Sequence, residues 1–207
     1  MADPAIRPYR QVARAEATYD LSQRIVASFL SALKTQWLDD ITLNAIAAEA
    51  RTTRQTVLRL FGSKDGLLAA AIDIWPDEVA KTYSRPQCKT PEELASAMVD
   101  MLEDLGPMFL RLLALAPRHS ELKRFVALGR ERHRQWFIES LSGFLNDLPP
   151  EAVEQAIAEC LIATDTYTWS LLRHEFGRSR AQTQATMATM MRRALDAHPF
   201  SSQAAVK

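Results

Sequence analysis

Glycine is scarce in this chain: six occur among 207 residues, and none precedes Gly62. The chain is rich instead in Ala, Leu, Arg, Glu and Met, which lose little conformational freedom on entering a helix. Apolar residues also recur at helical spacing, as at Ile25, Phe29 and Leu33. These features predict an all-α protein of about nine helices.

The composition is typical of a folded globular protein. Hydrophobic residues make up 47% of the chain and charged residues 24%, a balance far from that of disordered chains. The formal net charge is zero, which argues against non-specific coating of DNA or of anionic membranes. Any affinity for DNA must therefore come from cations gathered on one face.

The two cysteines, Cys88 and Cys160, have no Cys-x-x-Cys spacing and no companion histidines. We therefore expect neither a metal site nor a disulfide framework. No apolar run reaches the roughly 18 residues that span a bilayer, and the first residues lack the apolar stretch of a signal peptide. We expect a cytoplasmic protein with no cofactor and no membrane partner.

Two short helical segments near the N-terminus begin at capping residues. Thr42 can cap a helix that reaches Ala50, and Thr53 can cap a second helix from Arg54 to Leu60. Only two residues separate these helices, which leaves room for nothing but a tight turn. The pattern predicts a helix-turn-helix.

A helix-turn-helix suits duplex DNA because the major groove, about 12 Å wide, admits one α-helix. The second helix offers its first side chains to base edges, where Arg54 can pair with guanine and Gln55 with adenine. Helix N-termini also suit phosphate binding. The candidate DNA-binding residues are Thr42, Thr53, Arg54, Gln55, Thr56 and Arg59. The alternative for Arg54 and Gln55 is an ordinary solvated helix face.

The stretch from residue 42 to 68, TLNAIAAEARTTRQTVLRLFGSKDGLL, resembles the helix-turn-helix of the TetR family of transcriptional regulators. The resemblance implies a homodimeric repressor that binds a palindromic operator in double-stranded DNA and is released by a small-molecule effector. It also implies a phosphate contact for Lys64. Three positions depart from the family pattern: Arg51 replaces a turn glycine, Leu58 a phosphate-bonding tyrosine and Trp37 a glycine. A non-glycine residue held at positive φ costs roughly 1 kcal/mol.

The last two predicted helices, from about residue 150 to 176 and from about 179 to 197, carry apolar stripes. Doubled by a two-fold axis, they would form a four-helix bundle that holds two copies of the DNA-reading helix. The candidate interface residues are Val153, Ile157, Cys160, Leu161, Thr164, Thr168, Met187, Met190, Met191 and Leu195. The alternative is that these stripes pack only on their own chain.

Methionine and aromatic side chains gather in the rest of the C-terminal region. They are Met98, Met101, Phe109, Trp136, Phe137, Tyr167 and Trp169. Such side chains suit an apolar pocket that accepts varied ligands, and a bound effector could shift the dimer to a form that no longer fits DNA. The alternative, which each residue taken singly favours, is an ordinary core.

These patterns divide the chain into five parts. They are a basic N-terminal arm at 1–20, a helix-turn-helix domain at 21–62, a connecting helix at 63–84, a ligand-binding and dimerisation domain at 85–200 and a tail at 201–207. Within the larger domain, Gly106-Pro107 is predicted to end one helix, and residues from about 118 to 145 are predicted to form a single helix.

The sequence holds no HExxH motif, no glycine-rich phosphate loop and no G-x-S-x-G motif, so we do not expect an enzyme. The alternative to a DNA-binding regulator is a helical ligand-binding or adaptor protein without sequence-specific DNA binding. Salt-dependent binding to DNA separates the two functions.

Overall fold

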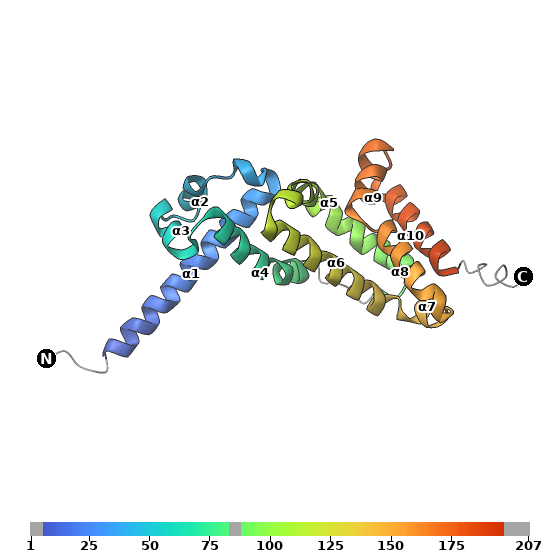
Figure 1. Cartoon of the computed structure of the whole chain (residues 1–207), viewed down its shortest axis with the longest axis horizontal. Helices are drawn as coiled ribbons and strands as arrows, with labels where there is room; N and C mark the ends of the chain where they lie inside the picture. The colour runs from blue at the N-terminus through green and yellow to red at the C-terminus, as the bar shows by residue number, and fades with distance from the viewer. Residues whose placement is uncertain (1–5, 83–87, 197–207) are drawn as a thin grey trace, which may run out of the picture. The chain divides into compact units, whose positions relative to one another are not determined.

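The structure is a computed structural model that describes residues 6–82 and 88–196, with side chains from 14 to 74 and from 88 to 196. Within these ranges every regular element is helical, with ten α-helices and a few short 3-10 and π-helical turns (Figure 1). The all-α prediction is confirmed. The chain divides into an N-terminal unit, Met1–Pro76, and a C-terminal unit, Asp77–Lys207.

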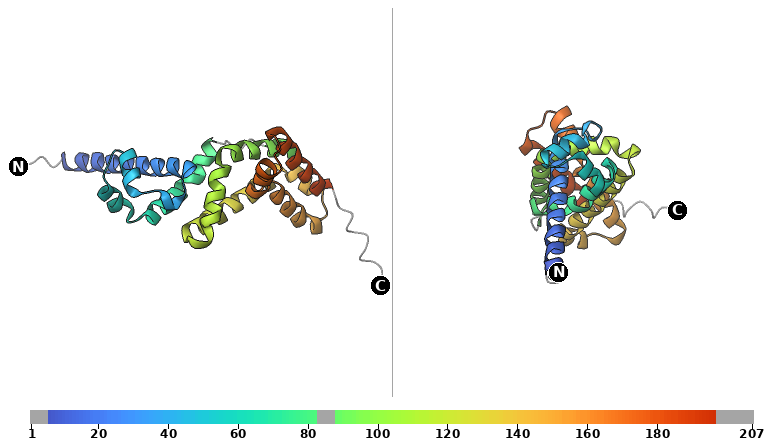
Figure 2. Two further views of the ribbon diagram at one scale, coloured as in Figure 1. Left: turned by 90° about the horizontal axis from the view of Figure 1, so that it is seen from above. Right: turned by 90° about the vertical axis from the view of Figure 1, so that its left-hand side faces the viewer.

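The N-terminal unit begins with a long helix, α1 (Ile6–Thr35). A 3-10 turn, η1 (Leu38–Asp40), leads to α2 (Leu43–Glu49) and α3 (Arg54–Phe61), and α4 (Lys64–Thr82) follows. The later half of α1 lies beside α2, and α2 packs on α3 (Figure 2). The three-helix order predicted for this unit is therefore present.

Helix α1 begins earlier than the sequence predicts. The backbone is helical from Ile6, so the described part of the expected arm at 1–20 continues α1 rather than preceding it. Ala and Arg in this segment have high helix propensity, and its one proline, Pro8, lies in the first turn, where proline is tolerated. The side chains of Arg7 and Arg10 lie outside the described residues.

One apolar core holds the N-terminal unit together. Ile25, Phe29 and Leu33 of α1 are all buried, as their spacing predicts. Helix α3 buries little of its surface: Val57 is fully buried, whereas Phe61 is only half-buried. The remaining side chains of α3 are therefore left on or near the surface.

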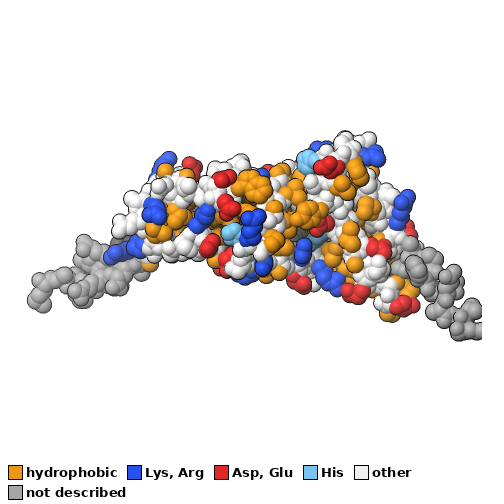
Figure 3. Space-filling view, turned by 45° about the horizontal axis from the view of Figure 1, so that its top comes forward, with side chains coloured by type: hydrophobic (Ala, Val, Ile, Leu, Met, Phe, Trp, Pro, Cys, Tyr) orange, Lys and Arg blue, Asp and Glu red, His pale blue; other side chains and the backbone are white. Residues whose placement is uncertain are grey.

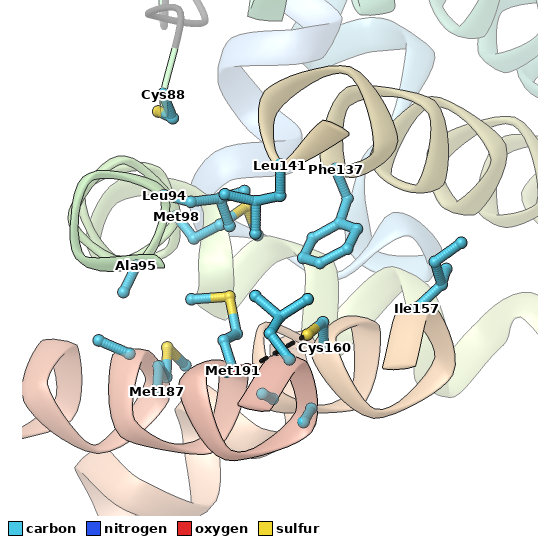
Figure 4. Close-up of a cluster of buried hydrophobic side chains, with 14 of the residues drawn as sticks. Cys88, Leu94, Ala95, Met98, Phe137, Leu141, Ile157, Cys160, Met187 and Met191 are labelled. Carbon is cyan, nitrogen blue, oxygen red and sulfur yellow. Dashed lines mark hydrogen bonds between the residues drawn. The ribbon is translucent and has the colours of Figure 1, made fainter. Parts of the chain in front are cut away.

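The C-terminal unit is built around α5 (Pro91–Leu115). It continues through α6 (Ser120–Ser140), α7 (Ser142–Asn146), α8 (Pro150–Ala163), α9 (Thr166–Ser170) and α10 (Arg180–Asp196). Helix α10 lies beside both α5 and α8 (Figure 1). Figure 4 shows side chains from these helices meeting in one core. No helix within the described residues is long and apolar enough to cross a membrane.

Helix α5 starts at a capping box, which the sequence Thr90-Pro91-Glu92-Glu93 predicts. The Thr90 hydroxyl accepts from Glu93 N at 3.2 Å, and the Glu93 carboxylate accepts from Lys89 N at 2.7 Å. The helix then runs through Gly106-Pro107, where the sequence predicts an end. The prediction is wrong because Gly106 is buried, and burial of the apolar face holds α5 together, while Pro107 lies on the exposed face.

Two helices predicted to be continuous are broken instead. The segment from about 118 to 145 divides at Leu141 into α6 and α7. The segment from 150 to 176 divides at Thr164, whose hydroxyl donates to Cys160 O at 2.9 Å, and Asp165 then caps α9 by accepting from Tyr167 N at 2.8 Å. A π-helical turn, η3 (Leu171–Glu175), follows α9.

Three ion pairs connect α5 to the end of the chain. Glu92 pairs with Arg192, Asp100 with Arg180, and Glu103 with Arg173. The residue numbers of the arginines fall as those of the acids along α5 rise. Helices α5 and α10 are therefore antiparallel. The Arg173 guanidinium donates to both oxygens of Glu103, at 2.6 and 2.9 Å, and lowers the pKa of that carboxyl below its ordinary value.

Candidate nucleic-acid interface

Helix α2 ends in a tight turn that sets the direction of α3. Arg51 N donates to Ala48 O at 3.1 Å and Thr52 N donates to Ala47 O at 2.8 Å, the hydrogen bonds of a Schellman motif. Arg51 occupies the left-handed position with φ of 54°, the one positive φ at a non-glycine residue in the described part of the chain. The expected strain is therefore present, at a cost of about 1 kcal/mol.

Both short helices begin at the predicted threonine caps. The Thr42 hydroxyl accepts from Ala45 N, and the Thr53 hydroxyl accepts from Thr56 N, each at 3.2 Å. The hydroxyls of Thr53 and Thr56 are also hydrogen-bonded to each other at 3.0 Å. These bonds stabilise the first turn of α3 and hold its backbone N–H groups in place.

The side chains that lead α3 point away from the core. Arg54 and Gln55, in its first turn, are exposed, and so is Arg59 further along. Thr56 is half-buried because its hydroxyl joins the cap, and Val57 faces inward. This placement leaves the three outward side chains accessible to a partner.

Unpaired positive charge gathers beside α3. The guanidinium groups of Arg51, Arg54 and Arg59 have no hydrogen-bond or ion-pair partner among the described residues. From residue 42 to 63 the sequence holds three arginines and one glutamate. This segment of a chain with zero net charge therefore carries a net positive charge, which is what phosphate binding requires.

Lys64 lies differently from what the family resemblance implies. Its ammonium donates to Leu38 O at 2.8 Å, to Asp39 O at 3.3 Å and to Ile41 O at 3.1 Å. These bonds use all three of its N–H donors, so none is left for a DNA phosphate. In this structure Lys64 ties the start of α4 to the turn that precedes α2.

The junction between α3 and α4 is equally tight. Ser63 caps α4, since its hydroxyl accepts from Gly66 N at 3.0 Å. A Cβ atom on Gly66 would lie 2.0 Å from the carbonyl oxygen of Phe61. Only glycine permits this approach, which fixes the end of α3 against the first turn of α4.

Most of the candidate dimer residues are buried within the C-terminal unit of a single chain. These are Ile157, Cys160, Thr164, Met187, Met191 and Leu195. The Cys160 thiol donates to Met191 O at 3.8 Å (Figure 4), and burial raises its pKa to about 12. These six side chains pack on their own chain, the alternative that the sequence left open. Only the other four, Val153, Leu161, Thr168 and Met190, reach the surface.

A different set of apolar side chains is exposed in this region. Ile162, Tyr167, Leu171 and Phe176 are between 45% and 62% exposed. Figure 3 shows hydrophobic side chains reaching the surface of the C-terminal unit. Of these four residues, Leu171 lies on the apolar stripe that the sequence predicts for the dimer, whereas Ile162 and Phe176 lie off that stripe, because the stripe assumes one unbroken helix. The sequence does mark them, because large apolar residues also occur at positions that do not share the helical spacing of Ile157 and Cys160.

The candidate ligand residues mostly share one cluster. Met98, Trp136, Phe137 and Trp169 are buried in the core of the C-terminal unit, and Met101 and Phe109 pack against it. Tyr167 does not join them, because its side chain is 54% exposed. The Trp169 indole N–H donates to Glu103 Oε1 at 2.9 Å, so this ring is fixed by a polar partner as well as by packing.

A short, capped helix with outward Arg and Gln side chains, held after a tight turn in a three-helix unit, defines a helix-turn-helix DNA-binding protein. Residues 38–71 match the family described as bacterial regulatory proteins, tetR family. The matched segment runs from η1 into α4 and so contains the whole helix-turn-helix. The chain therefore carries a DNA-binding domain of the tetR-family type, which supports a role as a transcriptional regulator.

The fold is also similar to a crystal structure of a tetR-family transcriptional regulator from Streptomyces coelicolor. The TM-score is 0.66 at 20% sequence identity, over 87% of this chain and 90% of that one. The similarity therefore extends through the helices of the C-terminal unit. No curated protein is significantly similar in sequence.

Proposed function

We propose that this protein is a ligand-released repressor that acts in the cytoplasm and binds a palindromic operator as a dimer. The observation that carries the proposal is the first turn of α3, where Arg54 and Gln55 are exposed and the Thr53 cap fixes the backbone. An arginine at this point can form two hydrogen bonds to guanine, and a glutamine can do the same with adenine. Thr42, Thr53 and Thr56 would set the position of the helix against the phosphates.

The electrostatics of the N-terminal unit support the same assignment. Arg59 adds to the same helix an exposed guanidinium that has no partner in the part of the chain that the structure describes. By contrast, Arg134 and Arg173 in the C-terminal unit pair with Glu154 and Glu103. Cations already paired within the protein gain less from a phosphate, so DNA binding is assigned to the N-terminal unit.

The test is selection of bound fragments from genomic DNA, followed by mobility shifts with one selected duplex. The variant Arg54→Ala is expected to lose about 1–3 kcal/mol of binding free energy against the selected sequence. The matched control is Arg130→Gln, which removes from α6 an exposed arginine that has no hydrogen-bond or ion-pair partner among the described residues. The control is expected to bind like the wild type. If the wild type gives no shift even at low salt, the protein is not a DNA-binding regulator of this kind.

The dimer is proposed to form through the exposed apolar residues near α9. Ile162, Leu171 and Phe176 would contribute the apolar area, together with Tyr167. Of the residues that the sequence predicts for the interface, Val153, Leu161, Thr168 and Met190 can still join them. A homodimer places two copies of α3 on the two half-sites of a palindrome.

The effector is proposed to bind among the methionine and aromatic side chains of the C-terminal unit. Met101 and Phe109 are partly buried at the edge of that cluster, so a small apolar molecule could enter there with limited repacking. Release of the operator would follow if the ligand binds more tightly to dimers whose reading helices do not fit DNA. A panel of small aromatic compounds that raise the melting temperature and also weaken the DNA shift would test this step.

A further inference from the structure

The turn of the helix-turn-helix carries an arginine at a position that disfavours it. Arg51 is held at φ of 54° by two backbone hydrogen bonds, its own to Ala48 O and that of Thr52 N to Ala47 O. Glycine adopts this conformation without steric penalty. Backbone strain of this kind is typical of functional sites, which suggests a functional role for the Arg51 side chain.

The Arg51 side chain gives the turn no support. Asn and Asp tolerate left-handed backbone because their short side chains bond locally to the main chain. Arg51 forms no such bond, and its exposed guanidinium has no hydrogen-bond or ion-pair partner within the described ranges. The Arg51 side chain therefore does nothing within the described structure to offset the unfavourable conformation.

The position of Arg51 indicates an external partner. It precedes the Thr53 cap by two residues and so stands at the entrance to α3, beside exposed Arg54. The nearest acid in the sequence, Glu49, is exposed and forms no ion pair with it in the described structure. A guanidinium at this point can form two hydrogen bonds to a phosphate oxygen pair.

We propose that Arg51 is a DNA-backbone contact: its guanidinium binds a phosphate at the edge of the groove that α3 enters. The inference rests on the proposed function, because it needs α3 to be the DNA-reading helix. It assigns Arg51 affinity without base preference, since phosphate contacts carry no sequence information. The same side chain compensates for the cation that Lys64 commits to the carbonyls of residues 38, 39 and 41.

Four variants of the full chain separate the charge of Arg51 from its backbone conformation. Arg51→Gly removes both the charge and the strain, Arg51→Asn removes the charge but tolerates the turn, and Arg51→Lys keeps the charge. Arg130→Gln is the control for loss of an exposed arginine elsewhere. The probe is a mixed-sequence duplex of about 30 base pairs, long enough for two half-sites one helical turn apart. Fluorescence anisotropy gives the dissociation constant from about 50 to 200 mM salt.

We expect Arg51→Gly and Arg51→Asn to weaken binding several-fold at the lowest salt. The slope of log affinity against log salt is expected to fall by about 0.9 for each phosphate that Arg51 no longer neutralises, or about 1.8 per dimer. The melting temperature of Arg51→Gly is expected to rise by about 2–4 °C, because the strain is relieved. Arg51→Lys should keep most of the slope, and Arg130→Gln should match the wild type.

Two results would overturn the inference, and they differ. If the wild type binds the duplex and Arg51→Gly binds it as tightly with the same salt slope, Arg51 is only a turn residue and the proposed function stands. If the wild type itself shows no salt-dependent binding, both the inference and the proposed function are overturned. A rise in melting temperature without a fall in affinity belongs to the first result.

Discussion

At the scale of single residues, the structure assigns Lys64 to the N-terminal unit itself. One ammonium group bonds three carbonyls that precede α2 in sequence by only a few residues. The bonds connect α4 to the first part of the helix-turn-helix, over 23 to 26 residues of sequence. Lys64 therefore holds together the segments before and after the helix-turn-helix, and so helps to fix the position of α3.

Replacement of Lys64 by methionine tests this assignment. Lys64→Met keeps the length of the side chain and removes all three hydrogen bonds, so unfolding free energy should fall by about 1–3 kcal/mol. Urea unfolding followed by circular dichroism measures the decrease, and hydrogen exchange assigns it to the N-terminal unit. The control, Lys123→Met on the exposed face of α6, should change little. Unchanged stability with a smaller salt slope for DNA would instead support a phosphate contact.

Gly106 tests how closely α5 and Trp169 pack. A Cβ atom at this position would lie 2.4 Å from Cζ3 and 2.6 Å from Cη2 of the indole. Gly106→Ala should therefore destabilise the protein by about 1–3 kcal/mol through overpacking. Gly129→Ala, in α6 where an added Cβ would contact no neighbouring side chain within 4 Å, should stabilise it by about 0.5–1 kcal/mol. The melting temperature is expected to fall for Gly106→Ala and to rise for Gly129→Ala. A rise in both variants would contradict the close contact between Gly106 and Trp169.

At the scale of elements, three ion pairs order the antiparallel packing of α5 against the last part of the chain. Glu103 is the most strongly held acid of the three, because it accepts from Arg173 and from Trp169. Trp169 lies in α9 and Arg173 in the π-helical turn that follows it. One carboxylate thus holds the segment that precedes the exposed residue Phe176.

The pH dependence of stability follows from this carboxylate. Hydrogen bonds from Arg173 lower the pKa of Glu103 below 4.5, so its contribution is complete above that value and disappears as pH falls through the lowered pKa. Glu103→Gln should reduce the unfolding free energy by about 1–2 kcal/mol near neutral pH. The difference between wild type and variant should shrink as the pH falls through the lowered pKa of Glu103. A difference that stays constant across an acid titration would contradict the assignment.

The helix boundaries show which parts of the fold can be predicted from the sequence. Capping residues are sufficient to predict the starts of α2, α3 and α5, because a cap is a local interaction between neighbouring residues. The breaks at Leu141 and Thr164 escape prediction because apolar periodicity continues across them. The role of Lys64 could not be predicted, since its acceptors are carbonyls brought close only by the fold.

At the scale of the whole molecule, the exposed apolar residues of the C-terminal unit are the proposed dimer interface. The variant Leu171→Glu with Phe176→Glu places two charges among them, so sedimentation should show monomers where the wild type forms dimers. DNA affinity should fall as well, because each monomer reaches one half-site. The control, Leu128→Glu, replaces an apolar residue on α6 that is 39% exposed and should leave the dimer intact. A double variant that remains dimeric would place the interface elsewhere.

The central claim is that two copies of α3 enter the major groove of one operator. Hydroxyl-radical footprinting of the wild type on a duplex selected from genomic DNA tests it directly. The expected result is two protected half-sites related by a palindrome, with centres about 34–36 Å or a multiple of that apart. A single protected site, or uniform protection along the whole duplex, would contradict the account.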